Sequence, residues 1–220
     1  MRTDRVSEAA QDYLREIYKL QTGNERVTTT ALAQKMGVSA PSATGMVKKL
    51  AALGLAEHAR YRGVRLTRAG ELIALEVLRH HRLLELYLAQ TLAMGLDAVH
   101  AEADRLEHVL SEQLERRIDV ALGRPTHDPH GHPIPNARLK IERTKTRPLS
   151  ALAPGDAADV QSVPDGDEDL LRYLISLALV PGQTVTLVEA APFNGPITVG
   201  VNGRRTAISA ELAAQIQVAA

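Results

Sequence analysis

The order of segments in the first 75 residues constrains the fold of this chain more than any other feature. Three short helical patterns are each preceded by Ser or Thr at the position expected for an N-cap, and the second and third end at glycine. A basic stretch with two β-like runs follows. The order helix, helix, helix and basic hairpin is typical of a winged helix. We therefore predict a winged helix-turn-helix DNA-binding domain over residues 1–75.

The charge distribution supports a polyanionic partner for this end of the chain. Residues 1–70 hold 12 Lys and Arg against 6 Asp and Glu, whereas residues 151–220 hold 3 against 8. Aromatic residues make up only 3% of the chain, which leaves little material for stacking on unpaired bases. The composition thus favours double-stranded DNA over single strands.

The third helix of this domain is the expected recognition helix. Recognition helices contact base edges with their N-terminal residues, which here are Pro41 and Ser42. Hydroxyl and basic side chains on the same helix and on the wing are expected to contact phosphates. These residues are Ser39, Thr44, Lys48, Lys49, Arg60 and Arg62.

Two long amphipathic helices are predicted next. The first is capped by Thr67 and runs from Arg68 to about Gln90, and the second runs from Asp97 to Gly123. Two helices are a thin core for one chain, so we expect them to pack against their copies in a homodimer. Residues 76–146 are accordingly predicted to be a helical dimerisation domain.

A cluster of potential metal ligands lies on one face of the second helix, because its members are spaced three, four or eight residues apart. The preceding helix offers a His and a Glu four residues apart, and the first helix offers an Asp. The chain has no cysteine, so any metal site here uses oxygen and nitrogen ligands. A solvated charged face is the alternative interpretation. The residues are His100, Asp104, Glu107 and His108, with His81, Glu85 and Asp12.

The C-terminal part, residues 147–220, is predicted to be a small SH3-like β-barrel. Its β-like runs are separated by turn residues, with Asn202 and Gly203 as a type I′ hairpin turn and one short helix in between. The preceding loop, residues 124–136, carries His127, His130 and His132 among four prolines; we interpret it as structural, with a further metal site as the alternative. The fold class of the whole chain is therefore mainly α.

The location of the chain follows from two absences in the sequence. No stretch approaches the roughly 18 consecutive apolar residues of a membrane span. The start, MRTDRVSEAA, lacks the apolar core of a signal peptide. We expect a cytoplasmic protein with no membrane partner.

Several motifs resemble the metal-dependent repressors typified by the diphtheria toxin repressor and the manganese transport regulator. They are DYL in the first helix, SAPSATGMVKKLAALGL, YRGVRLTRAG, RHHRLLELYL, VHAEADRLEHVLSEQLERR and HDPHGHPIP. The likeness covers nearly the whole chain. It implies a two-fold dimer that binds divalent metal and then operator DNA, and in this family the usual action is repression of metal uptake genes.

The resemblance also implies two metal sites. The main site would use Asp12, Asp104, Glu107 and His108. The second would use His81, Glu85 and His100, with a carboxylate from the C-terminal domain. Asp167 or Glu168 is the expected source of that carboxylate, whereas Leu170 stands where relatives have a Gln.

Departures from the family bear on which metal is sensed. Iron-responding members place Met at the position of Asp12 and Cys at that of Asp104. This chain has carboxylates at both positions, and hard oxygen donors favour Mn²⁺, with Fe²⁺ as the alternative. The manganese regulator has a second carboxylate where this chain has Arg15, so its two-metal geometry is not assumed here.

We therefore expect a divalent-metal-responsive transcriptional regulator whose dimer is ordered for operator binding by Mn²⁺. Two other classes stay open from the residues alone. A metalloenzyme also uses carboxylates and histidines on helices, although no spare general base stands beside these ligands. A winged-helix sensor of a small organic ligand is the other.

Overall fold

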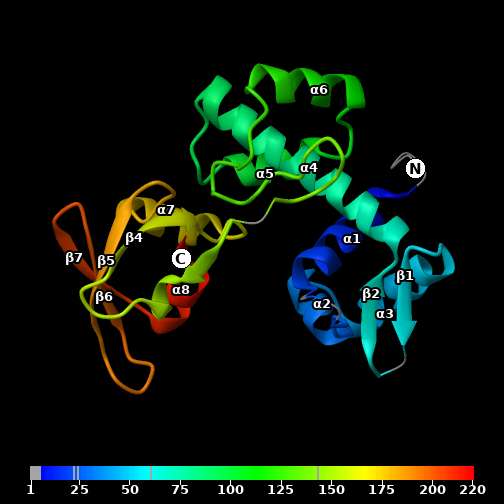
Figure 1. Ribbon diagram of the computed structural model, residues 1–220. Helices are drawn as coiled ribbons and strands as arrows, with labels where there is room; N and C mark the ends of the chain where they lie inside the picture. The colour runs from blue at the N-terminus through cyan, green and yellow to red at the C-terminus, as the bar shows by residue number, and fades with distance from the viewer. Residues whose placement is uncertain (1–5, 22, 24, 60, 143) are drawn as a thin grey trace. The chain divides into compact units, whose positions relative to one another are not determined.

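A computed structural model describes residues 6–21, 23, 25–59, 61–142 and 144–220 (Figure 1). The chain forms two compact units. The first holds the described residues up to His80 together with the segments 107–109 and 135–140, and the second holds 81–106, 110–134 and 141–220. A short segment far along the chain, at 107–109, thus belongs to the same unit as the N-terminal residues.

The first unit contains the expected winged helix. Side-chain caps begin two of its helices: Thr28 accepts from the amide of Ala31, and Ser39 accepts from the amide of Ser42. The helices enclose a core of fully buried apolar side chains, as the 3.6-residue spacing of those side chains predicts. The elements are α1 (Glu8–Leu20), α2 (Thr29–Lys35), α3 (Ala40–Ala52), β1 (Ala56–Ala59) and β2 (Gly63–Leu66), with β1 and β2 antiparallel.

Gly63 allows the wing to close on the segment before α2. Its φ is +90°, and a Cβ atom built there would lie 2.2 Å from the carbonyl oxygen of Val27. Val27 and Val64 pair through two backbone hydrogen bonds of 2.8 Å. Only glycine fits this close backbone approach, so the wing is anchored at its base.

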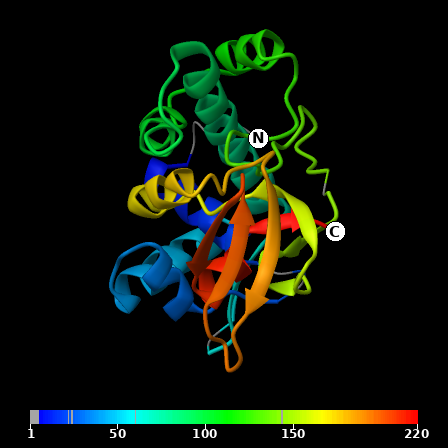
Figure 2. The ribbon, with the colours of Figure 1, turned by 90° about the vertical axis from the view of Figure 1, so that its left-hand side faces the viewer.

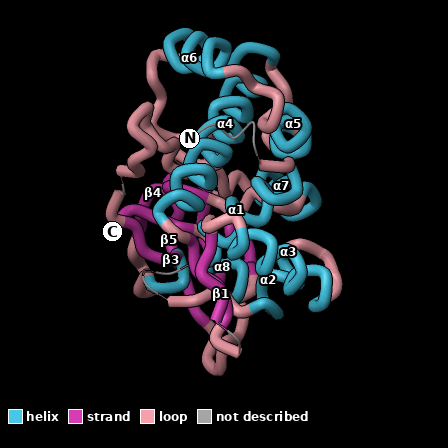
Figure 3. The backbone as a smooth tube through the Cα atoms, turned by 90° about the vertical axis from the view of Figure 1, so that its right-hand side faces the viewer, coloured by secondary structure: helices cyan, strands magenta, loops and turns pink. Residues whose placement is uncertain are grey.

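The prediction of one helix from Asp97 to Gly123 is wrong. The structure has α5 (Val99–Leu106) and α6 (Glu112–Ala121), which Figure 3 shows as separate helices. The physical reason is a helix start inside the predicted span, because Ser111 caps α6 by accepting from the amide of Leu114. Residues 107–110 form the connection, so Glu107 and His108 lie in a turn instead of on the face that carries His100 and Asp104.

The long helix before this break agrees with the prediction and extends slightly further. It is α4 (Arg68–Leu92), whose residues from His81 onward belong to the second unit. Leu83, Leu84 and Leu86 of α4 are buried with Ala103 and Ile118 in the helical core of that unit. Among the described residues, no helix is both long and apolar enough to cross a membrane.

The C-terminal part is an open sheet with two helices, not the closed barrel that was predicted. Figure 2 shows its long strands in yellow to red. The strand order is β3-β8-β4-β5-β6-β7, and β3 and β7 are not paired with each other in the described part of the chain. The fold class is therefore mixed α and β. The elements are β3 (Thr146–Pro148), β4 (Ala157–Ser162), α7 (Glu168–Ser176), β5 (Thr184–Ala190), β6 (Ile197–Val201), β7 (Arg204–Ile208), α8 (Ala210–Gln215) and β8 (Gln217–Ala219), with a 3-10 turn at Leu149–Ala151.

The predicted hairpin turn is present, whereas two short strands of the sheet, β3 and β8, were not predicted. Asn202 and Gly203 have φ values of 50° and 77°, as a type I′ turn requires. The strands β3 and β8 are only three residues long, too short for period-two alternation to reveal them. Their pairing, together with α8, completes the core around Leu149, Val218 and Ile216.

Candidate metal centre

The first cluster of metal-ligating side chains consists of Asp12, Glu107 and His108. Asp12 comes from α1, and the other two come from the turn after α5. His108 Nε2 lies 2.9 Å from Asp12 Oδ1 and 3.4 Å from Glu107 Oε1. One ligand atom from each residue lies within 4.8 Å of the other two, which is the spacing that a shared cation needs. Residues 96 positions apart thus meet in one compact unit.

Gln11 fixes the orientation of the His108 ring. Its amide nitrogen donates to the carbonyl oxygen of Val6 at 2.9 Å, so its oxygen is the atom that faces His108. His108 Nδ1 lies 2.9 Å from that oxygen and therefore donates to it. The opposite nitrogen, Nε2, is left to face Asp12. Such a partner on the far nitrogen is the usual support of a histidine that binds metal, and sequence reasoning missed it because Gln11 is not itself a ligand.

The electrostatics of this cluster favour positive charge. The hydrogen bond that Asp12 accepts from His108 raises the pKa of the ring, burial opposes the rise, and the charges of Glu107 and Asp12 add to it. The two carboxylates thus favour a positive charge at this position. A divalent cation would satisfy the same carboxylates and would take the place of a proton on the coordinating nitrogen.

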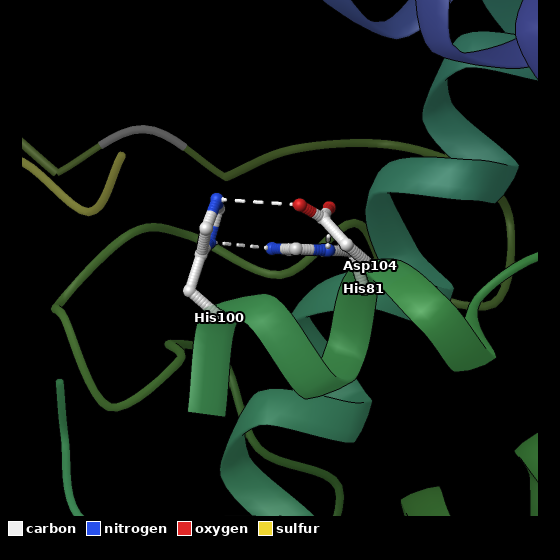
Figure 4. Close-up of side chains that lie close together, drawn as sticks. All are labelled: His81, His100 and Asp104. Carbon is white, nitrogen blue, oxygen red and sulfur yellow. Dashed lines mark hydrogen bonds and ion pairs between the residues drawn. The ribbon is translucent and has the colours of Figure 1, made fainter. Parts of the chain in front are cut away.

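The second cluster is built around Glu85 and includes His81, His100, Asp104, Asp128, His130 and Asp165. Figure 4 shows three of its members, with His100 and Asp104 of α5 both reaching toward His81 of α4. His81 Nδ1 lies 3.3 Å from Asp104 Oδ1, and His81 Nε2 lies 3.0 Å from His100 Nδ1. The structure therefore groups Asp104 with these two histidines.

One oxygen of Glu85 is the centre of the second cluster. Oε1 lies 3.0 Å from His81 Nε2, 2.9 Å from His100 Nδ1 and 3.6 Å from His130 Nδ1. Burial by itself would raise the pKa of Glu85, but the charge of His81 and hydrogen bonds from the three rings hold it well below its usual value. This fully buried carboxylate is thus ionised and ready to bind a cation.

The loop that we interpreted as structural supplies two members of this cluster. Asp128 and His130 are buried, and their ligand atoms lie within 4.8 Å of one another and of a Glu85 oxygen. His130 Nε2 lies 3.0 Å from the carbonyl oxygen of Leu96 and donates to it, so Nδ1 faces Glu85. His127 is exposed. The alternation of proline and histidine in the loop gives no helical or strand register, so the sequence carried no signal that separated His130 from His127.

The C-terminal residue that reaches this cluster is Asp165. Its carboxylate groups with Glu85 and His100 within the same 4.8 Å limit, and its Oδ2 lies 3.4 Å from His132 Nδ1. The two residues expected for this role stand elsewhere. Asp167 caps α7 by accepting from the amide of Leu170, and Glu168 is exposed 3.4 Å from Arg172. Asp165 stands two positions before Asp167, in the same acidic segment.

The second cluster fits a bound cation on the evidence of its unsatisfied atoms. Glu85 Oε2 and Asp128 Oδ2 are buried without a hydrogen-bond partner. Buried polar atoms are normally satisfied, and such a group points to an ion or ordered water. The donors are oxygens and imidazole nitrogens, which suit a first-row divalent metal.

The residues expected to read DNA lie on the surface of the first unit. Pro41, Ser42, Lys48 and Lys49 of α3 are exposed, as are Ser39 at its N-terminus and Arg62 of the wing. Thr44 is partly buried and donates to the carbonyl oxygen of Ala40 at 2.8 Å, which leaves only part of its hydroxyl for a phosphate. Arg60 lies outside the described residues.

Three family models match the chain in succession. They are described as the N-terminal DNA-binding domain of the iron-dependent repressors (residues 5–64), their metal-binding and dimerisation domain (67–136), and the FeoA domain (147–220). The iron-dependent repressor IdeR of Mycobacterium leprae is 30% identical over 218 residues, which cover 94% of each chain. The chain belongs to the iron-dependent repressor family. The family consists of transcriptional repressors and not of enzymes, so this repressor is a metal-responsive DNA-binding protein, as predicted.

Other relatives of this repressor include one whose name states no metal and one that is named for manganese. The diphtheria toxin repressor of Corynebacterium diphtheriae is 28% identical over 216 residues, which cover 94% of each chain. Among solved structures, a manganese-dependent transcriptional repressor in complex with manganese is 37% identical, with a TM-score of 0.88 over 96% of this chain and 99% of that one. IdeR is thus named for iron and the solved repressor for manganese, so the relatives of this repressor do not agree on one metal.

Proposed function

We propose that this repressor responds to Mn²⁺, which binds the first cluster and orders a homodimer for operator binding, and that the operators control metal uptake genes. The observation that carries the proposal is the meeting of Asp12 with Glu107 and His108. Asp12 lies on the helix that packs directly under α2 and α3, through Leu14 and Ile17 of the same core. A cation held by these three residues therefore acts on the scaffold of the recognition helix.

The mechanism is a shift between populations. Asp12 and Glu107 are both anionic ligands, so a bound cation joins α1 to the turn 107–109 and restricts how far the two segments move apart. Metal favours operator binding only by its higher affinity for the arrangement that binds DNA, and a tenfold bias needs about 1.4 kcal/mol of that difference. Pro41 and Ser42 would then contact base edges, and Arg62, Lys48 and Lys49 phosphates.

Manganese is preferred to iron because of the donor atoms. The first cluster offers two carboxylates and one imidazole, with no sulfur ligand. Hard oxygen donors suit Mn²⁺. Affinity alone would favour the later transition metals, so the coordination geometry and the supply of metal in the cell decide which ion occupies the cluster. Fe²⁺ is the alternative, and titration of the protein with each metal distinguishes the two.

We propose that the second cluster is a second metal site, held by Glu85, Asp128, His130 and Asp165, with His81, His100 and Asp104 around them. Its buried, unsatisfied atoms support this role. It would stabilise the second unit whatever the state of the first cluster. Removal of His130 is thus expected to lower the number of bound Mn²⁺ ions by one.

The same proposal assigns roles along the chain. Residues 1–75 bind DNA, 76–146 bind metal and dimerise, and 147–220 supply Asp165. A second copy of the chain is supported by Leu114 and Val120 of α6, which are 49% and 63% exposed. Because operator DNA is the partner, the site of action would be the cytoplasm.

The decisive experiment is a gel shift with operator DNA and increasing Mn²⁺. Asp12→Ala should keep the dimer folded and lose the response to metal, whereas Asp169→Ala, which removes an exposed carboxylate that pairs with Arg172 on α7, should respond like the parent. A normal Mn²⁺ response of Asp12→Ala would refute the coupling.

Equilibrium dialysis against Mn²⁺, Fe²⁺ and Zn²⁺ separates a metal sensor from a sensor of an organic ligand. We expect saturable binding that His108→Ala and His130→Ala each reduce. Absence of binding would refute both metal sites.

A further inference from the structure

Arg15 lies directly against a ligand of the first cluster. Its Nη1 is 2.5 Å from Oε1 and 2.6 Å from Oε2 of Glu107. Both residues are buried, with 8% of Arg15 and 1% of Glu107 exposed. A guanidinium group cannot lose its charge in a protein, so a permanent positive charge stands at this cluster.

A second carboxylate keeps Arg15 in this position. Arg15 Nε donates to Glu16 Oε1 at 3.2 Å, and Glu16 is itself buried on the same helix. Lys19 and Lys35 lie 3.7 Å and 4.0 Å from the carboxylate of Glu16. Because Arg15 bridges Glu16 and Glu107, moving it away would leave two buried carboxylates with less compensation, which is costly. The guanidinium therefore stays when a metal ion arrives.

The charges then limit how much metal the first cluster takes. Asp12, Glu16 and Glu107 supply three negative charges, and Arg15 already offsets one of them. One divalent ion therefore brings this group to neutrality, whereas two ions would leave two excess positive charges at a largely buried site, which is costly. The ligand count agrees, because Nη1 uses one lone-pair direction on each oxygen of Glu107.

We propose that Arg15 is a resident cation of the first cluster, which limits the cluster to one divalent ion and weakens its hold on that ion. The inference rests on the proposed metal-binding role of Asp12, Glu107 and His108. It makes Arg15 a residue that sets stoichiometry and affinity without binding the metal.

The first test counts Mn²⁺ bound to the full-length chain by elemental analysis, in the parent and in Asp12→Asn. The difference between the two counts is the number of ions at the first cluster. One ion is expected, and a difference of two would overturn the limit imposed by Arg15. A difference of zero would overturn the proposed function, and this inference with it.

The second test exchanges the charge of Arg15. Arg15→Gln should bind Mn²⁺ at the first cluster about tenfold more tightly by calorimetry, whereas Arg15→Lys, which keeps the charge, should stay within about threefold of the parent. In EDTA, Arg15→Gln should melt at a lower temperature than the parent, because Glu107 and Glu16 lose the guanidinium group that they share. Saturating Mn²⁺ should then raise its melting temperature more than it raises that of the parent.

Mn²⁺ can restore the melting temperature of Arg15→Gln only if the metal ion and Arg15 both compensate the negative charge of Glu107. Equal or weaker Mn²⁺ affinity in Arg15→Gln, with the same melting shift as the parent, would overturn the inference while leaving metal binding at the first cluster intact. If Arg15→Gln does not fold, the inference is still tested by the Mn²⁺ count of the parent and by the Mn²⁺ affinity of Arg15→Lys.

Discussion

Gln11 accepts a hydrogen bond from His108, with 2.9 Å between Gln11 Oε1 and His108 Nδ1. The two residues are 97 positions apart, and their contact selects which ring nitrogen faces the carboxylates of the first cluster. The orientation of the His108 ring thus depends on a neutral side chain outside the group of Asp12, Glu107 and His108.

Replacing Gln11 should therefore weaken metal binding. Gln11→Leu keeps the volume and removes the acceptor, so His108 loses its preferred orientation, and Mn²⁺ affinity should fall about 10-fold to 100-fold. Calorimetry measures the change. Gln34→Leu, at an exposed position of α2, is the matched control. An unchanged affinity in Gln11→Leu would show that the ring is held by other contacts.

Gly131 should tolerate no side chain. Its φ is +88°, and a Cβ there would lie 1.8 Å from the carbonyl oxygen of Gln161. We expect Gly131→Ala to lower the free energy of unfolding by about 2–4 kcal/mol. Gly155→Ala has a similar φ of +95° and no atom within 4 Å of its Cβ, so urea unfolding should show only about 1–2 kcal/mol for it. Equal losses in the two variants would argue against the contact with Gln161.

The stability of the protein in EDTA should fall as the pH rises through the range of His130. Burial would lower the pKa of His130, but the carboxylates of Glu85 and Asp128 raise it to about 9. Arg82 lies 3.4 Å from Asp128 and is charged throughout this range. Because the folded pKa exceeds the usual value of about 6.5, the stabilising proton is fully bound below that pH and is lost as the pH passes 9.

Thermal melting in EDTA from pH 6 to pH 10 measures this effect. His130→Gln should flatten the decline, and His127→Gln, on the exposed side of the same loop, should not. A decline of the same size in His130→Gln would assign it to other groups.

Arg62 on the wing should contribute a phosphate contact. Arg62→Ala is expected to weaken binding to all DNA sequences about equally and to reduce the salt slope by about 1. Arg65→Ala should have a smaller effect, because Arg65 is held by Glu57 at 2.8 Å. Titrations at several salt concentrations test both, and a loss of sequence preference in Arg62→Ala would indicate a base contact instead.

The sequence predicted the winged helix because caps and apolar spacing act locally. The family resemblance predicted Asp12, Asp104, Glu107 and His108 as one site. The structure brings Asp12, Glu107 and His108 together, although the helix expected to carry the last two ends at Leu106, and it places Asp104 with His81 and His100 instead. Residue spacing did not reveal that the chain turns there, since the cap at Ser111 competes with an otherwise continuous helical pattern.

The second cluster was only half visible in the sequence. His81 and Glu85 share a helix and could be paired by spacing, whereas Asp128, His130 and Asp165 come from segments without periodicity. Such segments are positioned by tertiary contacts, here the hydrogen bond of 3.0 Å from the amide of Val163 to the carbonyl oxygen of His130. Contacts of that kind have no local signature.

The two sides of α1 have different partners. Ala10, Leu14 and Ile17 are completely buried and tie the helix to the core of the winged helix, while positions 11, 12 and 15 meet the turn that follows α5. Substitutions in the second set therefore alter the hydrogen bonds and charges around Glu107 and His108 without removing an apolar contact from the core that carries α3.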